Sequence, residues 1–507
     1  MKAISAVSEI SRDSRSLGIT KYQLFCVSAA SLSSLNFGWN YVITNLPGDI
    51  ITTCLAGPKH NINGLPSCIP TTSFIWGIAV GSYALGALIG AIMCTWFANK
   101  YGRRFVLLYS NIIGLAAALL FGLPVNIEMV IAGRVVAGIA QGAANGAFSS
   151  YIIEITTPHA RSSLASMLQL ATRIGQLLAL VCALGMLKPP LWRVLFSLTS
   201  VFCIASMVLM VFCIESPKWL ALQGRTDEAR VALQRLRKGA DITEEFDQMT
   251  VALFAVGPDS KYTVSVLGVL LGRTPVNLRH QLLLGAMAMV FQQLSGINVV
   301  AFYSTALFST IFPTTDADRD ASKPTFPQIL SVVIAVVGTA AALVGMLLAN
   351  YLGRRTLMLI SHGLMAVFCV PISLGIIYNL PPLTITMVFL YFTVFFFGAG
   401  PLPWVIPNEI TPTYAASAIM AINSGMGYIC VFLISVSFSP MLAALQGYTF
   451  LVFAGANALA FMFFFFFLPE TKGRLVDDLV RVHSVGIHNV LKAKYKVDAY
   501  SRAKSPV

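Results

Sequence analysis

The chain of 507 residues is 56% hydrophobic and only 11% charged, and its mean hydropathy is +0.76. Soluble domains carry about 25% charged residues, so the composition argues against a soluble enzyme and indicates a protein that crosses a membrane several times. The net charge of +13 does not by itself indicate a nucleic-acid partner, because its meaning depends on where the basic residues lie.

Apolar windows of about 20 residues, the length of a membrane-spanning helix, occur twelve times along the chain. They fall at about 22–46, 74–97, 104–124, 129–153, 163–187, 191–214, 281–306, 327–350, 356–378, 384–408, 415–438 and 448–468. A charged segment separates six windows from six, and we expect it to form short amphipathic helices in water or at the membrane surface. The predicted organisation is an N-terminal tail at 1–21, a six-helix bundle at 22–214, a helical linker at 215–280, a second six-helix bundle at 281–468 and a tail at 469–507. The first tail lacks the pattern of a cleaved signal peptide, so the first span is expected to act as the signal.

The distribution of basic residues predicts the orientation of the spans. Of the 34 Lys and Arg residues, 27 lie in the two tails, the linker and the loops on that same side of the membrane. Five lie on the opposite side, and Arg134 and Arg173 lie within spans. Because positively charged loops stay in the cytosol, both termini and the linker are expected to be cytosolic.

Charged motifs recur between the two halves in the same order. The tripeptide Gly-Arg-Arg follows the second and the eighth span at an offset of 251 residues, and a Glu ends the fourth and the tenth span at an offset of 255. A further Glu follows the sixth and the twelfth span. The recurring pairs are Arg103 and Arg354, Arg104 and Arg355, Glu154 and Glu409, and Glu215 and Glu470. An internal repeat of six-helix units predicts two pseudo-symmetric bundles.

The stretch Phe291–Thr305, FQQLSGINVVAFYST, combines amide side chains with a glycine inside the seventh span. Amides offer donors and acceptors without charge, which suits a neutral ligand rich in hydroxyls and does not suit hydrocarbon. On an unbroken helix Gln293 and Asn298 would point about 140° apart, but Gly296 allows the helix to open, as discontinuous helices do at transporter sites. Two interpretations remain: a binding site that includes Gln292, or polar contacts that hold helices together.

Several motifs together resemble the sugar-porter branch of the major facilitator superfamily, and the facilitative glucose transporters in particular. The resemblance covers about 36–474 and is carried by GRR at 102–104 and 353–355, Glu154 with Arg161, Trp192-Arg193, ESPKWL at 215–220, QQLSGIN at 292–298, GPLPW at 400–404 and PETKGR at 469–474. It implies an all-α membrane protein of twelve transmembrane helices in two pseudo-symmetric six-helix bundles, the major facilitator fold, with a cytosolic helical linker. It also implies that the sugar is contacted by Gln169, Gln292, Gln293, Asn298 and Trp404. An indole can stack on a sugar ring, but Trp404 could equally anchor its helix at the membrane interface.

The resemblance further implies salt bridges at the cytosolic ends of the spans, which hold an outward-open state. The residues concerned are Arg103, Arg104, Glu154, Arg161, Glu215, Arg354, Arg355, Glu409 and Glu470. We expect Glu154 to pair with Arg161 and the GRR arginines to pair with Glu409. An arginine that the family carries after Glu409 is missing from 411–418, so the C-terminal set is expected to be incomplete. Exposed pairs contribute about 0–1 kcal/mol each, so such a network biases alternating states rather than locking one.

Other positions also depart from the family's pattern. Proton-coupled members carry an aspartate where Asn40 stands, and a proton-driven carrier needs a titratable group in its pathway. Asn40 therefore favours facilitated diffusion, and we include it among the candidate sugar contacts. Two sugar-binding asparagines of the family are replaced by Gly338 and Gly427, a tryptophan by Tyr428 and a glutamate by Phe396.

Arg173 adds a charge to the fifth span, where Ser166, Gln169, Arg173 and Gln176 share one helix face. An Arg at the centre of a span costs about 2.5–3.5 kcal/mol on insertion scales, so it must face water, a polar partner or a ligand. One interpretation is that Arg173 lines the cavity beside Gln169 and shifts selectivity toward an anionic or more oxygenated ligand. The other is a structural arginine that bonds helix carbonyls.

Cys54 and Cys68 flank a polar loop on the side where disulfides can form. They are either a disulfide or two free thiols.

We predict that the protein is not an enzyme but transports a monosaccharide such as a hexose by facilitated diffusion with alternating access. A proton-coupled sugar symporter and a non-transporting sugar sensor remain as alternatives. The expected partners are the sugar and the lipid bilayer, without nucleic acid, cofactor or metal, and a monomer would suffice. The plasma membrane is expected rather than a vacuolar or lysosomal membrane.

Overall fold

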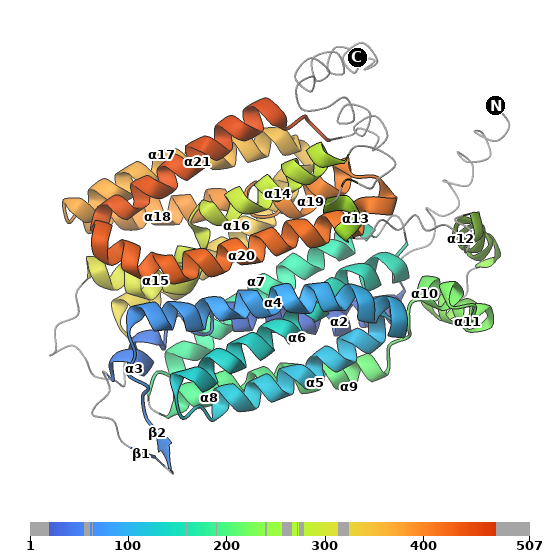
Figure 1. The fold of residues 1–507 in the computed structure, drawn as a ribbon, viewed down its shortest axis with the longest axis horizontal. Helices are drawn as coiled ribbons and strands as arrows, with labels where there is room; N and C mark the ends of the chain where they lie inside the picture. Colours follow the sequence, from blue (N-terminus) through green and yellow to red (C-terminus); the bar gives the residue numbers. More distant parts are fainter. Residues whose placement is uncertain are drawn as a thin grey trace. The chain divides into compact units, whose positions relative to one another are not determined.

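A computed structural model describes residues 20–54, 61–62, 64–157, 161–188, 190–238, 241–255, 266–270, 272, 278–312 and 324–472. The regular structure of these residues is helical, apart from one antiparallel hairpin of two-residue strands, β1 (Asn61–Ile62) and β2 (Leu65–Pro66) (Figure 1). The protein is therefore an all-α membrane protein, as its composition predicts.

Each of the twelve predicted spans coincides with one helix or with two consecutive helices. Nine correspond to single helices: α2 (Lys21–Val42), α4 (Ser73–Tyr101), α5 (Arg103–Gly122), α6 (Ile127–Ile155), α7 (Arg161–Gly185), α16 (Phe326–Tyr351), α17 (Arg354–Ile377), α20 (Thr413–Leu445) and α21 (Thr449–Phe467). Three are interrupted: α8 (Leu191–Ser197) with α9 (Thr199–Val211), α14 (Arg279–Leu294) with α15 (Ile297–Ile311), and α18 (Pro381–Phe395) with α19 (Leu402–Ile410).

By length and apolar composition alone, nine stretches of the described residues qualify as membrane-spanning helices. The difference from twelve has physical causes. The stretch Ala418–Phe467 contains most of α20 and all of α21, which a short 3₁₀ turn separates. The apolar part of the tenth span is divided between α18 and α19, so neither piece is long enough. The remaining helix, α2, is too polar, because it carries buried Ser and Asn side chains.

The chain divides into two compact units. The first comprises Met1–Ile43, Gly86–Cys182 and Pro190–Ser260, and the second comprises Thr44–Leu85, Ala183–Pro189 and Lys261–Val507. Helix α4 belongs to the second unit up to Leu85 and to the first from Gly86 onward. The domain boundaries predicted from the sequence stay a prediction.

In the first unit, helices α2 and α7 approach each other at backbone distance. A Cβ atom added to Gly38 would lie 1.9 Å from the carbonyl oxygen of Thr172, and one added to Gly175 would lie 2.0 Å from the carbonyl oxygen of Leu35. Only glycine fits such an approach. This contact fixes the part of α7 that carries Arg173.

The linker forms short helices, as predicted: α10 (Pro217–Leu222), α11 (Thr226–Leu236), α12 (Thr243–Ala255) and α13 (Val266–Leu270). Helix α11 is amphipathic and buries Ala229, Ala232, Leu233 and Leu236, a spacing that places them on one face. Its end is held against the end of α6 by Arg237, which donates to the Ile155 carbonyl at 3.1 Å and pairs with Glu245 at 2.7 Å.

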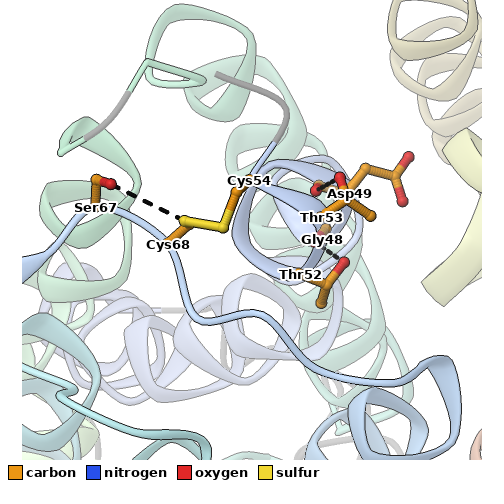
Figure 2. Close-up of a disulfide and its surroundings, with 7 residues drawn as sticks. All are labelled: Gly48, Asp49, Thr52, Thr53, Cys54, Ser67 and Cys68. Atoms are coloured by element: carbon orange, nitrogen blue, oxygen red, sulfur yellow. Dashed lines mark hydrogen bonds between the residues drawn. A yellow bond between two sulfur atoms is a disulfide. The ribbon is translucent and has the colours of Figure 1, made fainter. Parts of the chain in front are cut away.

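In the second unit, Cys54 and Cys68 form a disulfide, which decides between the two interpretations of the sequence (Figure 2). The bridge joins the end of α3 (Gly48–Thr53) to the segment that follows the hairpin. That segment also donates a backbone hydrogen bond from Ile69 to the Ile51 carbonyl at 2.8 Å. The segment that contains Cys68 and Ile69 is therefore held against α3 by the disulfide and by a backbone hydrogen bond.

Candidate functional site

The seventh span is broken at Gly296, as the sequence predicts. Gly296 has a φ of +92°, in the left-handed region that favours glycine. A Cβ atom here would also lie 2.7 Å from the ring of Phe453. The break ends α14 at Leu294 and starts α15 at Ile297, so the amide side chains lie on two short helices rather than on one.

The three amides around the break form a chain of hydrogen bonds. The Asn298 side chain donates to Gln293 Oε1 at 2.6 Å, and Gln293 Nε2 donates to Gln292 Oε1 at 3.1 Å. Gln292 Nε2 in turn donates to the carbonyls of Ala399 and Gly400, at 2.9 and 2.5 Å. All three amides are buried. The break thus brings Gln293 and Asn298 into contact, although an unbroken helix would separate them.

The acceptors of Gln292 lie at the second interruption in this unit, between α18 and α19. The interruption contains Gly-Ala-Gly-Pro, and Pro401 lacks a backbone N–H. Trp404 follows Gly400 by one turn and is half-buried. The two broken helices are therefore joined by the Gln292 amide, and we refer to Gln292, Gln293 and Asn298 as the amide set.

Two glycines at positions where the family carries asparagine have different surroundings. At Gly338 a Cβ atom would lie 2.3 Å from the ring of Phe392 and 3.0 Å from the ring of Phe396, so aromatic rings fill the space. At Gly427 the nearest atoms to a Cβ would be Met289 Cβ at 3.7 Å and Gln293 Nε2 at 3.8 Å, which is ordinary contact. Of these two positions, only Gly427 leaves room for a side chain, and it does so beside the amide set.

In the first unit, the candidate residues of α7 lie on one face. Arg173 donates to Gln176 Oε1 at 2.7 Å, and Gln169 lies one turn earlier and is half-buried. Arg173 therefore has the polar partner that its depth in the span requires, and both of its predicted roles stay predictions.

Asn40 is fully buried and engaged by its own unit. Its amide donates to Asn36 Oδ1 at 2.8 Å, and its Oδ1 accepts from the Thr199 hydroxyl at 3.1 Å. Arg134, which is also buried, donates to the Asn40 backbone carbonyl at 2.5 Å. The predicted sugar contact of Asn40 stays a prediction.

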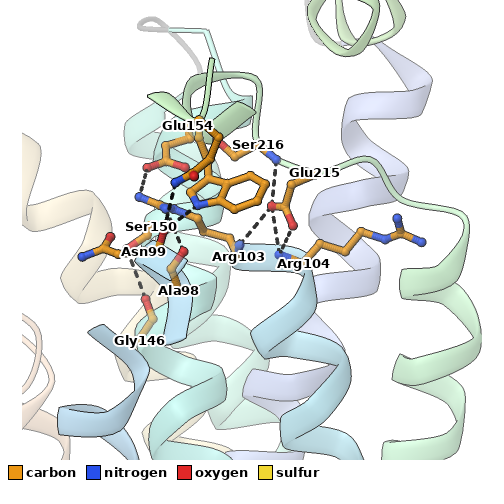
Figure 3. A network of polar contacts seen from close by, with 11 residues as sticks. Ala98, Asn99, Arg103, Arg104, Gly146, Ser150, Glu154, Glu215 and Ser216 are labelled. Atoms are coloured by element: carbon orange, nitrogen blue, oxygen red, sulfur yellow. Dashed lines mark hydrogen bonds and ion pairs between the residues drawn. The ribbon is translucent and has the colours of Figure 1, made fainter. Parts of the chain in front are cut away.

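The charged residues after the second span form a compact network (Figure 3). Arg103 pairs with Glu154 at 2.9 Å and donates to the Ala98 carbonyl at 3.0 Å. Glu215 accepts from the backbone N–H groups of Arg103 and Arg104 at 3.0 and 3.1 Å. Burial raises the pKa of the Glu215 carboxyl, and these N–H donors oppose that shift.

The same arrangement recurs in the second unit, as the repeat predicts. Arg354 pairs with Glu409 at 3.0 Å, and Glu470 accepts from the Arg354 backbone N–H at 2.7 Å. The Thr471 hydroxyl also donates to Glu409. Arg355 donates to the Phe465 carbonyl at 3.0 Å.

The expected pairings of these charges in the first half stay predictions. Glu154 pairs with Arg103, the first residue of α5. The Arg161 side chain lies outside the described residues. The Arg104 side chain donates to the carbonyls of Met210 and Val211, at 3.0 and 2.7 Å.

Three polar residues near the break were not singled out from the sequence. The carbonyl of Ser295 accepts from the Tyr391 hydroxyl at 2.5 Å and from the Asn457 amide at 3.2 Å. The Asn457 Oδ1 lies 3.0 Å from His362 Nδ1. Polar and ionisable residues inside predicted spans are costly, and this signal would have identified His362 and Asn457.

A family model matches most of the chain. Residues 25–482 match a model described as "Sugar (and other) transporter". The chain belongs to this family. Its membership agrees with the resemblance inferred from the GRR, QQLSGIN, GPLPW and PETKGR motifs.

Among relatives, a mouse protein named "Solute carrier family 2, facilitated glucose transporter member 3" is 30% identical over 483 residues, covering 93% of this chain and 94% of that protein. A Caenorhabditis elegans protein named "Facilitated glucose transporter protein 1" is 29% identical, covering 91% of this chain and 90% of that protein. This member of the sugar transporter family therefore matches them along nearly their full lengths.

Solved structures confirm the fold. The chain is similar to the proton:xylose symporter XylE bound to 6-bromo-6-deoxy-D-glucose, with a TM-score of 0.72 and 21% identity over 91% of this chain and 99% of that one. It is also similar to the inward-open xylose transporter XylE from E. coli, with a TM-score of 0.73 and 20% identity over 91% of this chain and 100% of that one. The protein has the twelve-helix major facilitator fold of two pseudo-symmetric six-helix bundles with a helical linker.

Proposed function

We propose that the protein carries a monosaccharide, such as a hexose, across a membrane by facilitated diffusion with alternating access. The observation that carries this proposal is the amide set at the break in the seventh span. Gln292, Gln293 and Asn298 offer uncharged donors and acceptors, which suit the hydroxyls of a neutral sugar. The names of the relatives, both facilitated glucose transporters, support the same substrate class.

Several polar atoms of the amide set are joined to one another, and this favours binding of a polyol. In such a chain each amide is oriented by its neighbour, so a hydroxyl meets donors and acceptors whose directions are already set. Gln169 on α7 and Trp404 on α19 stay proposed contacts of the same sugar. An indole supplies an apolar face, and the Gln169 amide supplies further hydrogen bonds.

The residue at position 40 favours facilitated diffusion over proton coupling. Asn40 cannot titrate, and its amide is held by Asn36 and Thr199. A proton-coupled carrier needs a group that changes charge in the pathway. The symporter XylE shares the fold, so proton coupling is the alternative that the experiment below must exclude.

We further propose that the two charged networks face the cytosol and favour one state of the transport cycle. The excess of basic residues on that side supports this orientation and places both termini there. Breaking the Arg103–Glu154 and Arg354–Glu409 pairs would then accompany the change to the other state. The plasma membrane remains the proposed location.

The test is uptake by the purified protein reconstituted in liposomes, with labelled hexose, pentose and acidic sugar, each with and without an imposed pH gradient. We expect saturable hexose uptake that neither the gradient nor a protonophore changes. Uptake that the gradient drives uphill would establish a symporter instead. Binding of sugar without any uptake would establish a sensor.

Variants of the amide set connect the transport to the proposed site. Asn298→Leu removes one hydrogen-bonding group, and a bond of this kind contributes about 1 kcal/mol, so KM should rise roughly fivefold to tenfold. Asn111→Leu is the matched control, since Asn111 is equally buried at 2% exposure but donates within the first unit to Leu107 and Ser206. The control is expected to lower stability without changing KM.

A further inference from the structure

The break at Gly296 creates a local hydrogen-bonding problem that the structure solves with side chains. Where a helix is interrupted, carbonyls near the break lose their partners in the next turn. The Ser295 carbonyl is such a group, and the residue is buried. It accepts from the Tyr391 hydroxyl of α18 at 2.5 Å and from the Asn457 amide of α21 at 3.2 Å.

Helix α21 contacts the break at two points one turn apart. The ring of Phe453 packs against Gly296, where it would meet a Cβ atom at 2.7 Å. Asn457 lies four residues later, on the same face of the helix. Its Nδ2 donates to the Phe453 carbonyl at 2.9 Å as well as to Ser295.

The orientation of the Asn457 amide depends on His362. Because Asn457 Nδ2 faces two carbonyls, its Oδ1 faces His362 Nδ1, 3.0 Å away. An amide oxygen only accepts, so the imidazole carries its proton on Nδ1 and donates it to Asn457. The imidazole is fully buried, and its ring stacks on Phe464 with the centroids 5.4 Å apart. His362 Nε2 has no hydrogen-bond partner among the described residues, so this one bond is the polar contact that the ring makes there.

We propose that His362, Asn457 and Tyr391 are positioning residues for sugar binding. They hold the Ser295 carbonyl, and with it the geometry of the break that places Gln293 against Asn298. None of the three is proposed to touch the sugar. The proposal rests on the proposed function, because it concerns the affinity of the amide set for its ligand.

The variants separate the hydrogen bond from the packing of the ring. His362→Phe keeps a ring that can stack on Phe464 but removes the donor to Asn457. His362→Asn restores a donor close to the position of Nδ1. Tyr391→Phe removes the other donor to the Ser295 carbonyl. Ser373→Ala is the matched control, since its hydroxyl is equally buried and donates to the Gly447 carbonyl at 2.8 Å, away from the break.

The first measurement is the KM and maximal rate of hexose uptake in proteoliposomes. His362→Phe and Tyr391→Phe should each raise KM about fivefold, which corresponds to about 1 kcal/mol at 1.4 kcal/mol per tenfold change, with the maximal rate within twofold. His362→Asn and Ser373→Ala should keep the KM of the unchanged protein. An unchanged KM in His362→Phe, or an equal rise in His362→Asn, overturns the proposal.

The second measurement needs no transported substrate and is hydrogen–deuterium exchange of the peptide that contains Gly296. We expect its amides to exchange several-fold faster in His362→Phe and at the unchanged rate in His362→Asn and Ser373→Ala. Equal exchange in all variants overturns the proposal, whatever sugar the protein carries. If the unchanged protein transports no sugar, the proposed function fails, and faster exchange in His362→Phe but not in His362→Asn or Ser373→Ala still supports the role of His362 at the break.

Discussion

Neutralising three of the glutamates that pair with arginines, Glu154, Glu409 and Glu228, should destabilise the protein in the order of their burial. The side chains of Arg103 and Glu154 are 11% and 9% exposed, whereas those of Arg354 and Glu409 are 23% and 26% exposed. The side chains of Arg225 and Glu228, which pair at the surface of the linker, are 50% and 58% exposed. Replacing each glutamate by glutamine keeps the shape of the side chain and removes its charge.

The structure sets the expected size of each effect. Removing one partner of a buried pair costs about 3–5 kcal/mol, because the other charge stays buried. Glu154 Oε2 and Arg103 Nε have no partner among the described residues, so the lower value of about 3 kcal/mol applies. For a unit of about 210 residues this lowers the melting temperature by roughly 6–12 °C.

The other two substitutions should cost less. Water reaches the Arg354–Glu409 pair, and glutamine can still accept from Thr471, so Glu409→Gln should cost about 1 kcal/mol, or roughly 2–4 °C. Glu228→Gln should leave the melting temperature unchanged, since an exposed pair is solvated and screened.

The assay is thermal unfolding of the purified protein in detergent, at one salt concentration for all variants. The double variant Arg103→Met with Glu154→Gln should recover part of the loss, because it leaves no buried charge without its partner. Equal losses for Glu154→Gln and Glu228→Gln would refute the reasoning, since burial would then not govern the cost.

Three further predictions follow from single positions. Gly427→Ala should be tolerated or stabilise α20 by up to about 1 kcal/mol, whereas Gly338→Ala should cost about 1–3 kcal/mol because the Phe rings beside it must move. Thermal unfolding compares the two variants, and equal stabilities would contradict the packing around the two glycines. Replacing Cys54 and Cys68 by serine should lower the free energy of unfolding by about 3 kcal/mol for a loop of this length. Thiol labelling of the unchanged protein should detect both cysteines only after reduction, and labelling before reduction would contradict the disulfide. Arg173→Leu should change the ratio of acidic to neutral sugar uptake, and an unchanged ratio in the substrate panel would leave Arg173 a structural role with Gln176 as its partner.

The helices could be predicted because membrane spans are set by apolar length and charge placement, which a sequence states directly. The break at Gly296 was also predictable, since a glycine among amide side chains inside a span marks a place where the helix can open around a polar site. The recurring GRR and Glu motifs predicted the pairing of Arg354 with Glu409, which the structure contains.

The remaining contacts depend on distances across the fold that a sequence does not contain. Glu154 could pair with any basic residue at the same depth, and the packing of α5 against α6 places Arg103 beside it. The choice between a disulfide and free thiols likewise required the positions of Cys54 and Cys68. The linkage from His362 through Asn457 to Ser295 joins three helices, so only the assembled unit reveals it.

The most direct test of the account is exchange of labelled glucose against unlabelled glucose in proteoliposomes that carry no ion gradient. The account predicts exchange well above that of protein-free liposomes, independent of pH difference, and nearly lost when Gln293 and Asn298 are both replaced by leucine. Exchange that is absent from the unchanged protein, or fully retained in the double variant, would contradict the claim that these amides bind the transported sugar.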